Sequence, residues 1–173
     1  VVVSEFACAA IKNDGTVVSW GSALAGGDSH DVSHQLFDVR EITATHSAFA
    51  AIKSDESVVA WGDPRNGGSC EEVQKDLFDV QKIFASNTAF AAIRSDGHVV
   101  TWGAKNAGGD SQAVQSQLVD VKQIHSTSVA FAAVRQDGSV VTWGAMTGGG
   151  DSSSTELMSV VQIHSTTRSF AAL

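Results

Sequence analysis

Positive charge is scarce in this chain and is nowhere clustered. Its 173 residues include 11 Lys and Arg against 19 Asp and Glu, which gives a formal net charge of −8. Because non-specific affinity for nucleic acid comes mainly from clustered Lys and Arg side chains, we expect no nucleic-acid partner. No apolar run approaches the length of a membrane span, so we also expect no direct membrane insertion.

Cysteine and targeting signals are scarce as well. The two cysteines, Cys8 and Cys70, do not suggest a disulfide framework, and a bond between them is not expected. The sequence starts at Val1 without an initiator Met, and its first residues lack the charged and apolar regions of a signal peptide. We therefore expect either a chain processed after targeting or a piece of a longer protein, and the sequence names no compartment.

Motifs for catalysis and for metal or cofactor binding are also lacking. The sequence holds no Gly-x-Ser-x-Gly elbow, and its Gly-Gly-Asp triplets lack the following Lys of a phosphate-binding loop. His30 and His34 are four residues apart, with Asp28 and Asp31 nearby, a spacing that suits zinc. Such a pair on a solvated surface usually binds nothing. The sequence therefore predicts no enzyme, no cofactor and no metal site.

A regular repeat dominates what the chain does contain. Trp20, Trp61, Trp102 and Trp143 are each followed by Gly and stand 41 residues apart. A spacing this regular indicates a repeat architecture. Before each Trp-Gly come an apolar Ala-rich segment, a polar turn and a Val-Val pair, a pattern that predicts a β-hairpin. A third strand precedes each hairpin, over Val1–Ser4, Ile42–Thr45, Ile83–Ser86, Ile124–Thr127 and Ile163–Thr166.

Two positions depart from the repeat in ways that carry expectations. Three of the hairpin turns hold Asp-Gly, but the second holds Asp55-Glu56, so we expect a strained or differently shaped turn there. Cys8 takes the place that Phe occupies in the following repeats, at Phe49, Phe90 and Phe131, which favours a buried packing role.

A glycine-rich loop and a polar stretch follow each Trp. In the polar stretch Val and Leu stand four apart, as in Val32 and Leu36, a spacing that suits one helical turn lying over the sheet. Asp28, Asp110 or the serines after them could cap this turn. The fourth repeat is two residues shorter here, since Leu157 comes two positions early.

The repeats predict an all-β fold, a β-propeller of antiparallel blades. A small sheet cannot bury both faces alone, so the units must stack. The units are 1–41, 42–82, 83–123 and 124–162, with 163–173 as a partial fifth, and 1–173 is expected to be one domain. We expect about four blades, as an open arc or as part of a larger propeller. The alternative arrangement is a closed four-bladed ring. A linear β-solenoid fits less well, because the repeats of β-solenoids are usually shorter.

The pattern of FAA, Asp-Gly, Val-Val-x-Trp-Gly and a glycine pair resembles the repeat of the regulator of chromosome condensation family. The resemblance covers essentially the whole chain and implies a propeller, which in this family usually has seven blades. The repeats are shorter than those of the founding member and are closer in length to those of secreted β-lactamase inhibitor proteins with the same propeller. The family also implies a guanine-nucleotide exchange factor, but the inserted hairpin and basic tail used for that role have no counterpart here.

The Trp-Gly positions do not resemble the light-sensing tryptophans of the plant ultraviolet-B photoreceptor, whose Gly-Trp-Arg-His-Thr motif is absent. We expect the tryptophans to pack between blades. The family role that needs no special residue, a rigid platform for protein partners, fits best.

Strand direction predicts where partners bind. If the first strand of a unit runs upward, the loop that follows it and the loop after Trp-Gly lie on one face. The repeats differ most in these loops, and loops on a rigid scaffold are frequent binding sites. The expected partner-binding residues are His46, Arg65, Asn66, Asn87, Lys105, Asn106 and Arg168.

These observations predict a non-catalytic protein-interaction scaffold or an accessory subunit of a larger protein assembly. One alternative is a protein inhibitor that covers an enzyme with the loop face, although aromatic residues are scarce in these loops. The other alternative is a guanine-nucleotide exchange factor for a small GTPase.

Overall fold

The computed structural model describes residues 1–153, 155 and 157–173, which form an all-β chain. Four three-stranded antiparallel sheets are followed by a two-stranded one, and we call them blades 1 to 5 in chain order. Blade 1 contains β1 (Val2–Val3), β2 (Ala7–Ile11) and β3 (Val17–Gly21); blade 2 contains β4 (Val39–Ala44), β5 (Ala48–Lys53) and β6 (Val58–Gly62); blade 3 contains β7 (Val80–Ala85), β8 (Ala89–Arg94) and β9 (Val99–Gly103); blade 4 contains β10 (Val121–Ser126), β11 (Ala130–Arg135) and β12 (Val140–Gly144); blade 5 contains β13 (Ile163–Ser165) and β14 (Phe170–Ala172).

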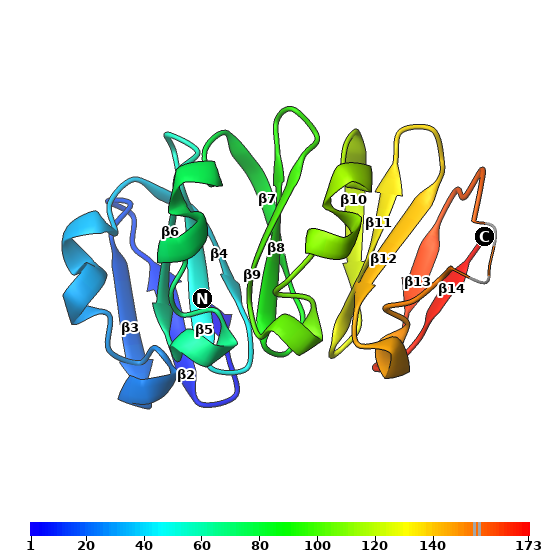
Figure 1. Cartoon of the computed structure of the whole chain (residues 1–173). Helices are drawn as coiled ribbons and strands as arrows, with labels where there is room; N and C mark the ends of the chain where they lie inside the picture. The colour runs from blue at the N-terminus through cyan, green and yellow to red at the C-terminus, as the bar shows by residue number, and fades with distance from the viewer. Residues whose placement is uncertain (154, 156) are drawn as a thin grey trace.

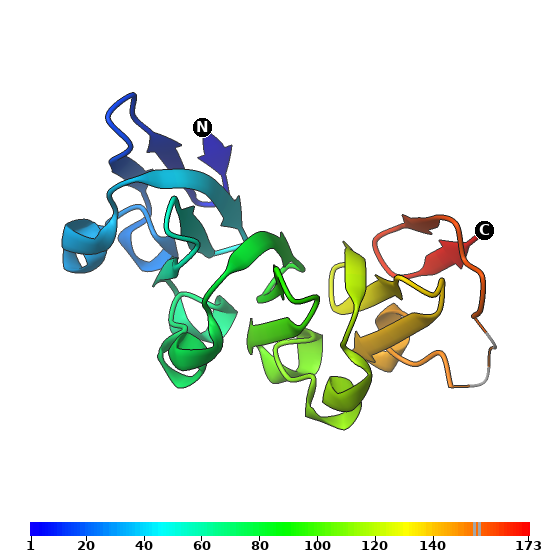
Figure 2. The same cartoon turned by 90° about the horizontal axis from the view of Figure 1, so that it is seen from above.

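The blades follow one another along an open arc, as Figure 1 shows from the side and Figure 2 from above. The first strand of each blade lies on the inside of the arc, where Arg40 of β4 donates a hydrogen bond to the carbonyl of Val80 in β7, 2.7 Å away. Among the described residues no strand of blade 1 pairs with blade 5. The predicted antiparallel propeller blades are therefore confirmed. In this chain they form an arc, which fits both an open arc and a part of a larger propeller, and the closed four-bladed ring is wrong.

The hydrophobic core lies between the blades rather than inside them. The middle strands are the most deeply buried, and every residue of β5 is buried. One core cluster joins Ala91 of blade 3 to Phe131 and Trp143 of blade 4, together with the fully buried Leu118 from the connecting segment. Blades 2 to 4 bury both faces of their sheets against the neighbouring blades, which is why one blade alone could not fold.

Short 3₁₀-helices occupy the segments after each Trp-Gly. The predicted helical turn between blades is a 3₁₀-helix that ends at a buried leucine, Leu36, Leu77 or Leu118. The N-cap residues Ser29 and Ser111 make no side-chain capping bond, so the predicted capping by the serines is wrong. One position earlier, a carboxylate oxygen of Asp28 accepts from the backbone N–H of His30 at 2.9 Å, and Asp110 accepts from Gln112 in the same way. The described 3₁₀-helices are η1 (Ala23–Ala25), η2 (His30–Gln35), η3 (Pro64–Asn66), η4 (Glu71–Asp76), η5 (Lys105–Ala107), η6 (Gln112–Gln117) and η7 (Met146–Gly148).

The shortened connection of the fourth repeat falls partly on positions 154 and 156, which lie outside the described residues. Leu157 is half-buried there and packs against the core cluster of blades 4 and 5. Within the described part of the chain, no helix is long and apolar enough to cross a lipid bilayer.

Glu56 adopts the backbone conformation of the glycines that it replaces. Its φ is 64°, against 79° at Gly15, 76° at Gly97 and 81° at Gly138. The turn therefore keeps the shape of the others, and the expected strain is present because an L side chain is held in the left-handed region.

Replacing Glu56 by Gly should raise the free energy of unfolding by about 0.5–1 kcal/mol, because removal of the left-handed cost exceeds the extra entropy that glycine loses on folding. Urea unfolding measures the change. Glu56→Ala is the matched control, since it also removes the hydrogen bond from Gln81 to the Glu56 carboxylate but keeps the strained φ. A stability gain in the Ala variant equal to that in the Gly variant would contradict the explanation.

Candidate partner-binding face

The loops before each middle strand and the loops after each Trp-Gly lie on the same face of the arc, as the strand directions within a unit predicted. In blade 2 the backbone N–H of Asp63 donates to the carbonyl of Ser47 at 2.9 Å. The Thr45 hydroxyl donates to the carbonyl of Asn66, also at 2.9 Å. Blades 3 and 4 repeat the second bond through Ser86 and Thr127. These bonds join the two sets of loops into one surface, the loop face, at the lower edge of Figure 1.

The inner part of the loop face is a backbone ladder that crosses all the blades. His46 donates its N–H to the carbonyl of Asn87 at 2.8 Å, Asn87 donates to Ser128 at 3.0 Å, and Ser128 donates to Thr167 at 2.9 Å. Glu5 continues the ladder by donating to His46 at 3.3 Å. We call Glu5, His46, Asn87, Ser128 and Thr167 the inner rim. A shallow polar hollow of about 370 Å³ runs along most of it.

Two predicted site residues, His46 and Asn87, therefore lie together on the inner rim. The His46 side chain is exposed, pairs with the Glu5 carboxylate and lies edge-on to the Phe6 ring with centroids 5.5 Å apart. Asn87 is also exposed. Arg168 is exposed one position beyond the rim residue Thr167.

The other predicted residues lie on the post-Trp helices, and two of them, Arg65 and Lys105, border grooves between blades. Arg65 of η3 borders a groove of about 400 Å³ between blades 1 and 2, and its guanidinium lies 3.1 Å from the Asp63 carboxylate. Hydrogen bonding from the Arg65 side chain lowers the pKa of Asp63. Asn66 donates to the same carboxylate at 3.0 Å, so its amide braces the loop. Asn106 is exposed on η5.

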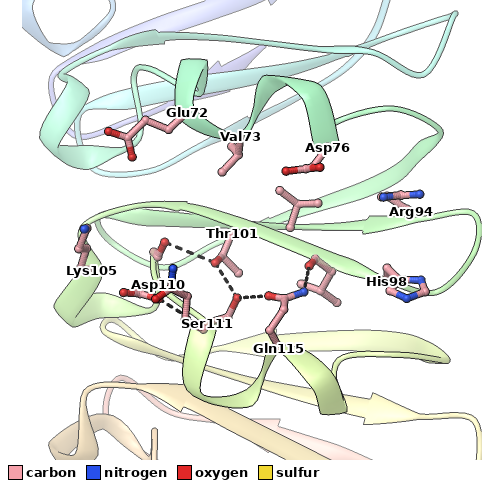
Figure 3. Close-up of a pocket in the computed structure, with 14 residues that line it drawn as sticks. Glu72, Val73, Asp76, Arg94, His98, Thr101, Lys105, Asp110, Ser111 and Gln115 are labelled. Atoms are coloured by element: carbon pink, nitrogen blue, oxygen red, sulfur yellow. Dashed lines mark hydrogen bonds between the residues drawn. The ribbon is translucent and has the colours of Figure 1, made fainter.

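Lys105 of η5 borders the corresponding groove between blades 2 and 3, which is drawn in Figure 3 and has a volume of about 420 Å³. Its lining mixes charges of both signs, with Glu72, Asp76 and Asp110 alongside Arg94 and His98. Sequence reasoning missed this groove because its walls come from two repeats.

A chain of hydrogen-bonded side chains forms the floor of this groove. The Thr101 and Ser111 hydroxyl oxygens are 2.9 Å apart, and Ser111 donates to Gln115, which in turn donates to the carbonyl of Val99. The hydroxyl pair recurs at Ser19–Ser29 and Thr142–Ser152, ten residues apart each time. This ten-residue spacing of hydroxyl residues is the sequence signal that could have predicted the contact. The contact holds the connecting segment against the third strand of the blade.

Titratable groups elsewhere are dispersed. Burial lowers the pKa of His125 on β10, and His164 on the neighbouring inner strand lowers it further. Burial raises the pKa of the Cys70 thiol to about 11, so it is protonated at neutral pH. The described residues contain no cluster of three or more His, Cys, Asp or Glu that could hold a metal ion.

Cys8 and Cys70 are both free. The buried position expected for Cys8 is wrong, since Cys8 is half-buried. Its blade lies at the end of the arc, where the face that other blades bury is open.

No protein-family model matches this sequence, and no curated protein matches it. Solved structures do match it. Human WBSCR16 is 15% identical with a TM-score of 0.60, and the match covers 99% of this chain and 51% of that one. Yeast RCC1 (Prp20), solved bound to Kap60, is 18% identical with a TM-score of 0.60, covering 99% and 48%.

The ectodomain of the Arabidopsis thaliana receptor kinase ACR4 is 17% identical with a TM-score of 0.52, covering 93% and 55%. The chain thus spans about half the length of the solved structures that it matches. The open arc, the antiparallel blades and these matches agree with the repeat pattern, and the chain has the fold of the RCC1-type β-propellers, those of the regulator of chromosome condensation.

Proposed function

We propose that this chain is a non-catalytic protein-interaction scaffold or accessory subunit that holds its partner on the loop face. The observation that carries the proposal is the inner rim. Its backbone is a continuous hydrogen-bonded ladder, while its side chains are all different: Glu5, His46, Asn87, Ser128 and Thr167. A rigid support that presents varied side chains is typical of a recognition surface.

The position before the rim differs from it in this respect. One residue before His46, Asn87 and Ser128 stands a hydroxyl residue, Thr45, Ser86 or Thr127, whose side chain binds the loop after the Trp of the same blade. The side-chain type is the same in these blades at the position where the hydroxyl supports the fold. It differs from blade to blade at the rim position that follows. The outer groove residues Arg65 and Lys105 would extend the contact surface around the rim.

The comparisons support a protein partner in general terms. Prp20 was solved bound to Kap60, and a second Prp20 structure was reported with its binding properties to Gsp1p and histones. One propeller of this fold, Prp20, therefore binds a protein, and we propose the same for this chain. We take residues 1–173 to act here as one unit, because the rim ladder runs through every blade.

The test is affinity capture from the source cells with the whole chain and a rim variant, His46→Ala combined with Asn87→Ala. Loss of these two exposed side chains should weaken the captured complex at least about tenfold, because a few residues near the centre of an interface carry most of its affinity. The matched control is Ser95→Ala combined with Gln136→Ala. These two exposed residues lie at hairpin turns, on the face of the blades opposite to the loop face.

Equal loss in the control variant, or a native mass showing a stable chain without any partner, would contradict the proposal. A nucleotide-release assay on small GTPases should stay flat. Accelerated release would favour the exchange factor instead, and inhibition of an enzyme found in the captured complex would favour the inhibitor.

A further inference from the structure

Two histidines stand at the same level on the neighbouring inner strands of blades 4 and 5. His125 of β10 pairs with Ala132, and His164 of β13 pairs with Ala171 in the equivalent register. The strand β10 packs against β13. The residues at this level in the other three blades are Val2, Thr43 and Phe84. Among the described junctions, this one alone therefore brings two ionisable side chains to this level.

A rung of the inner rim lies directly beyond the histidine pair. The backbone N–H of Ser128 donates to the carbonyl of Thr167 at 2.9 Å, and this bond joins blades 4 and 5. Ser128 follows His125 by three residues, and Thr167 follows His164 by three. The rung between blades 3 and 4, from Asn87 to Ser128 at 3.0 Å, stands in the same way beyond Phe84 and His125. The two rungs thus share their geometry and differ in the side chains beside them.

The surroundings of His125 offer no negative charge that would stabilise an imidazolium. His125 is half-buried, its burial lowers its pKa, and His164 lowers it further. The strands packed against β10 are β7, β8, β11 and β13, and none of them contains Asp or Glu. Their charged residues and that of β10 itself are all cations: Lys82, Arg94, Arg135 and Lys122. Asp120 comes one residue before β10, at the opposite end of the strand from His125.

We propose that the junction of blades 4 and 5 is an acid-sensitive contact, in which protonation of His125 and His164 sets two like charges side by side and opens the rung from Ser128 to Thr167. The closed junction is most stable while His125 is neutral. Its stability falls as the pH drops below about 6.5, the ordinary pKa of histidine, because the open junction binds the proton more readily than the closed one. Histidine is the side chain suited to such a response near neutral pH.

The opening would alter the surface proposed for partner binding. Ser128 and Thr167 belong to the inner rim, so a partner that spans blades 4 and 5 would be held less tightly at acid pH. This consequence rests on the proposed function, whereas the acid sensitivity of the junction does not.

The test is amide hydrogen exchange, followed by NMR on the whole chain without a partner at pH 7.5 and pH 5.5. Exchange rates are divided by the intrinsic rate of each amide at each pH, which gives a protection factor. Protection of the Ser128 amide should fall at least about threefold more than that of the Asn87 amide, the scale of one charge–charge interaction between partly exposed groups. Asn87 is the internal reference, because its rung has Phe84 in place of one histidine.

Substitutions at His164 assign the effect to the pair. The side chain of His164 is exposed, so its replacement leaves the core intact. His164→Gln removes one of the two charges and should cancel the extra loss of protection at pH 5.5. His164→Lys places a permanent charge beside His125 and should lower the protection of Ser128 already at pH 7.5. The matched control is His98→Gln, which removes an exposed imidazole at the hairpin turn of blade 3 and should leave the pH effect unchanged.

An equal loss of protection at Ser128 and Asn87 would overturn the proposal, as would a full pH effect in the His164→Gln variant. A pH effect cancelled by His98→Gln would also contradict it. Since no partner is present in the exchange experiment, its result is independent of the affinity capture that tests the proposed function.

Discussion

Trp102→Ala should lower the free energy of unfolding by about 3–5 kcal/mol, the usual cost of truncating a buried large aromatic side chain to alanine. Trp102 is only 4% exposed and stacks on Phe90 with ring centroids 5.1 Å apart. The change would leave a cavity between blades 2 and 3 and would remove the only side-chain donor to the Gly67 carbonyl among the described contacts. Two blades lose packing at once, because the indole belongs to the interface and not to one sheet.

Trp20→Ala is the matched control for this prediction. Trp20 occupies the same repeat position and the same place at the end of a third strand, but it is 47% exposed. Its loss should cost less than about 1 kcal/mol, within the range of ordinary surface substitutions. Urea unfolding followed by circular dichroism measures both variants. Comparable losses at the two positions would show that the tryptophans act within their own strands and not between blades.

Gly108→Ala should be about as damaging, at about 2–6 kcal/mol. Gly108 has φ 95°, a conformation that costs other residues about 1–3 kcal/mol. An added Cβ would lie 2.4 Å from Cδ2 of Phe131, and forcing that ring aside costs about 1–3 kcal/mol more. The ring cannot move freely, because Phe131 is fully buried and stacks on Trp143.

Gly15→Ala separates the two costs in this second prediction. Gly15 has a similar φ of 79°, but a Cβ there would meet nothing closer than Asp38 Cα at 3.2 Å. The control should therefore show the backbone cost with little of the clash. Unfolding midpoints of the two variants give the difference, and identical midpoints would mean that the Phe131 contact adds nothing to the role of Gly108.

Much of the fold could be predicted because the repeat makes each local pattern appear several times. The hairpins, the preceding strands and the helical turns ending at Leu36, Leu77 and Leu118 all follow from patterns within a few residues. The Glu56 turn is the informative case. The sequence indicated an irregularity, and the structure shows that the backbone keeps its shape and carries the strain at φ 64°.

The candidate site was predicted less completely. Strand direction correctly placed the two sets of loops on one face, since that depends only on the antiparallel order within a blade. The inner rim could not be predicted, because its ladder joins Glu5, His46 and Asn87 across intervals of 41 residues and depends on how the blades stack. For the same reason the grooves beside Arg65 and Lys105 were missed.

The sequence by itself determined the unit: its length, its strands, its turns and the direction of its loops, because each depends on interactions within one repeat. Only the tertiary structure decided what equivalent residues do. Trp20 is half exposed while Trp102 is buried, and Cys8 lies at an open face where the matching Phe90 is enclosed. The physical reason is that burial in this fold occurs between blades, so a residue's environment is set by the neighbouring blade and not by its own repeat.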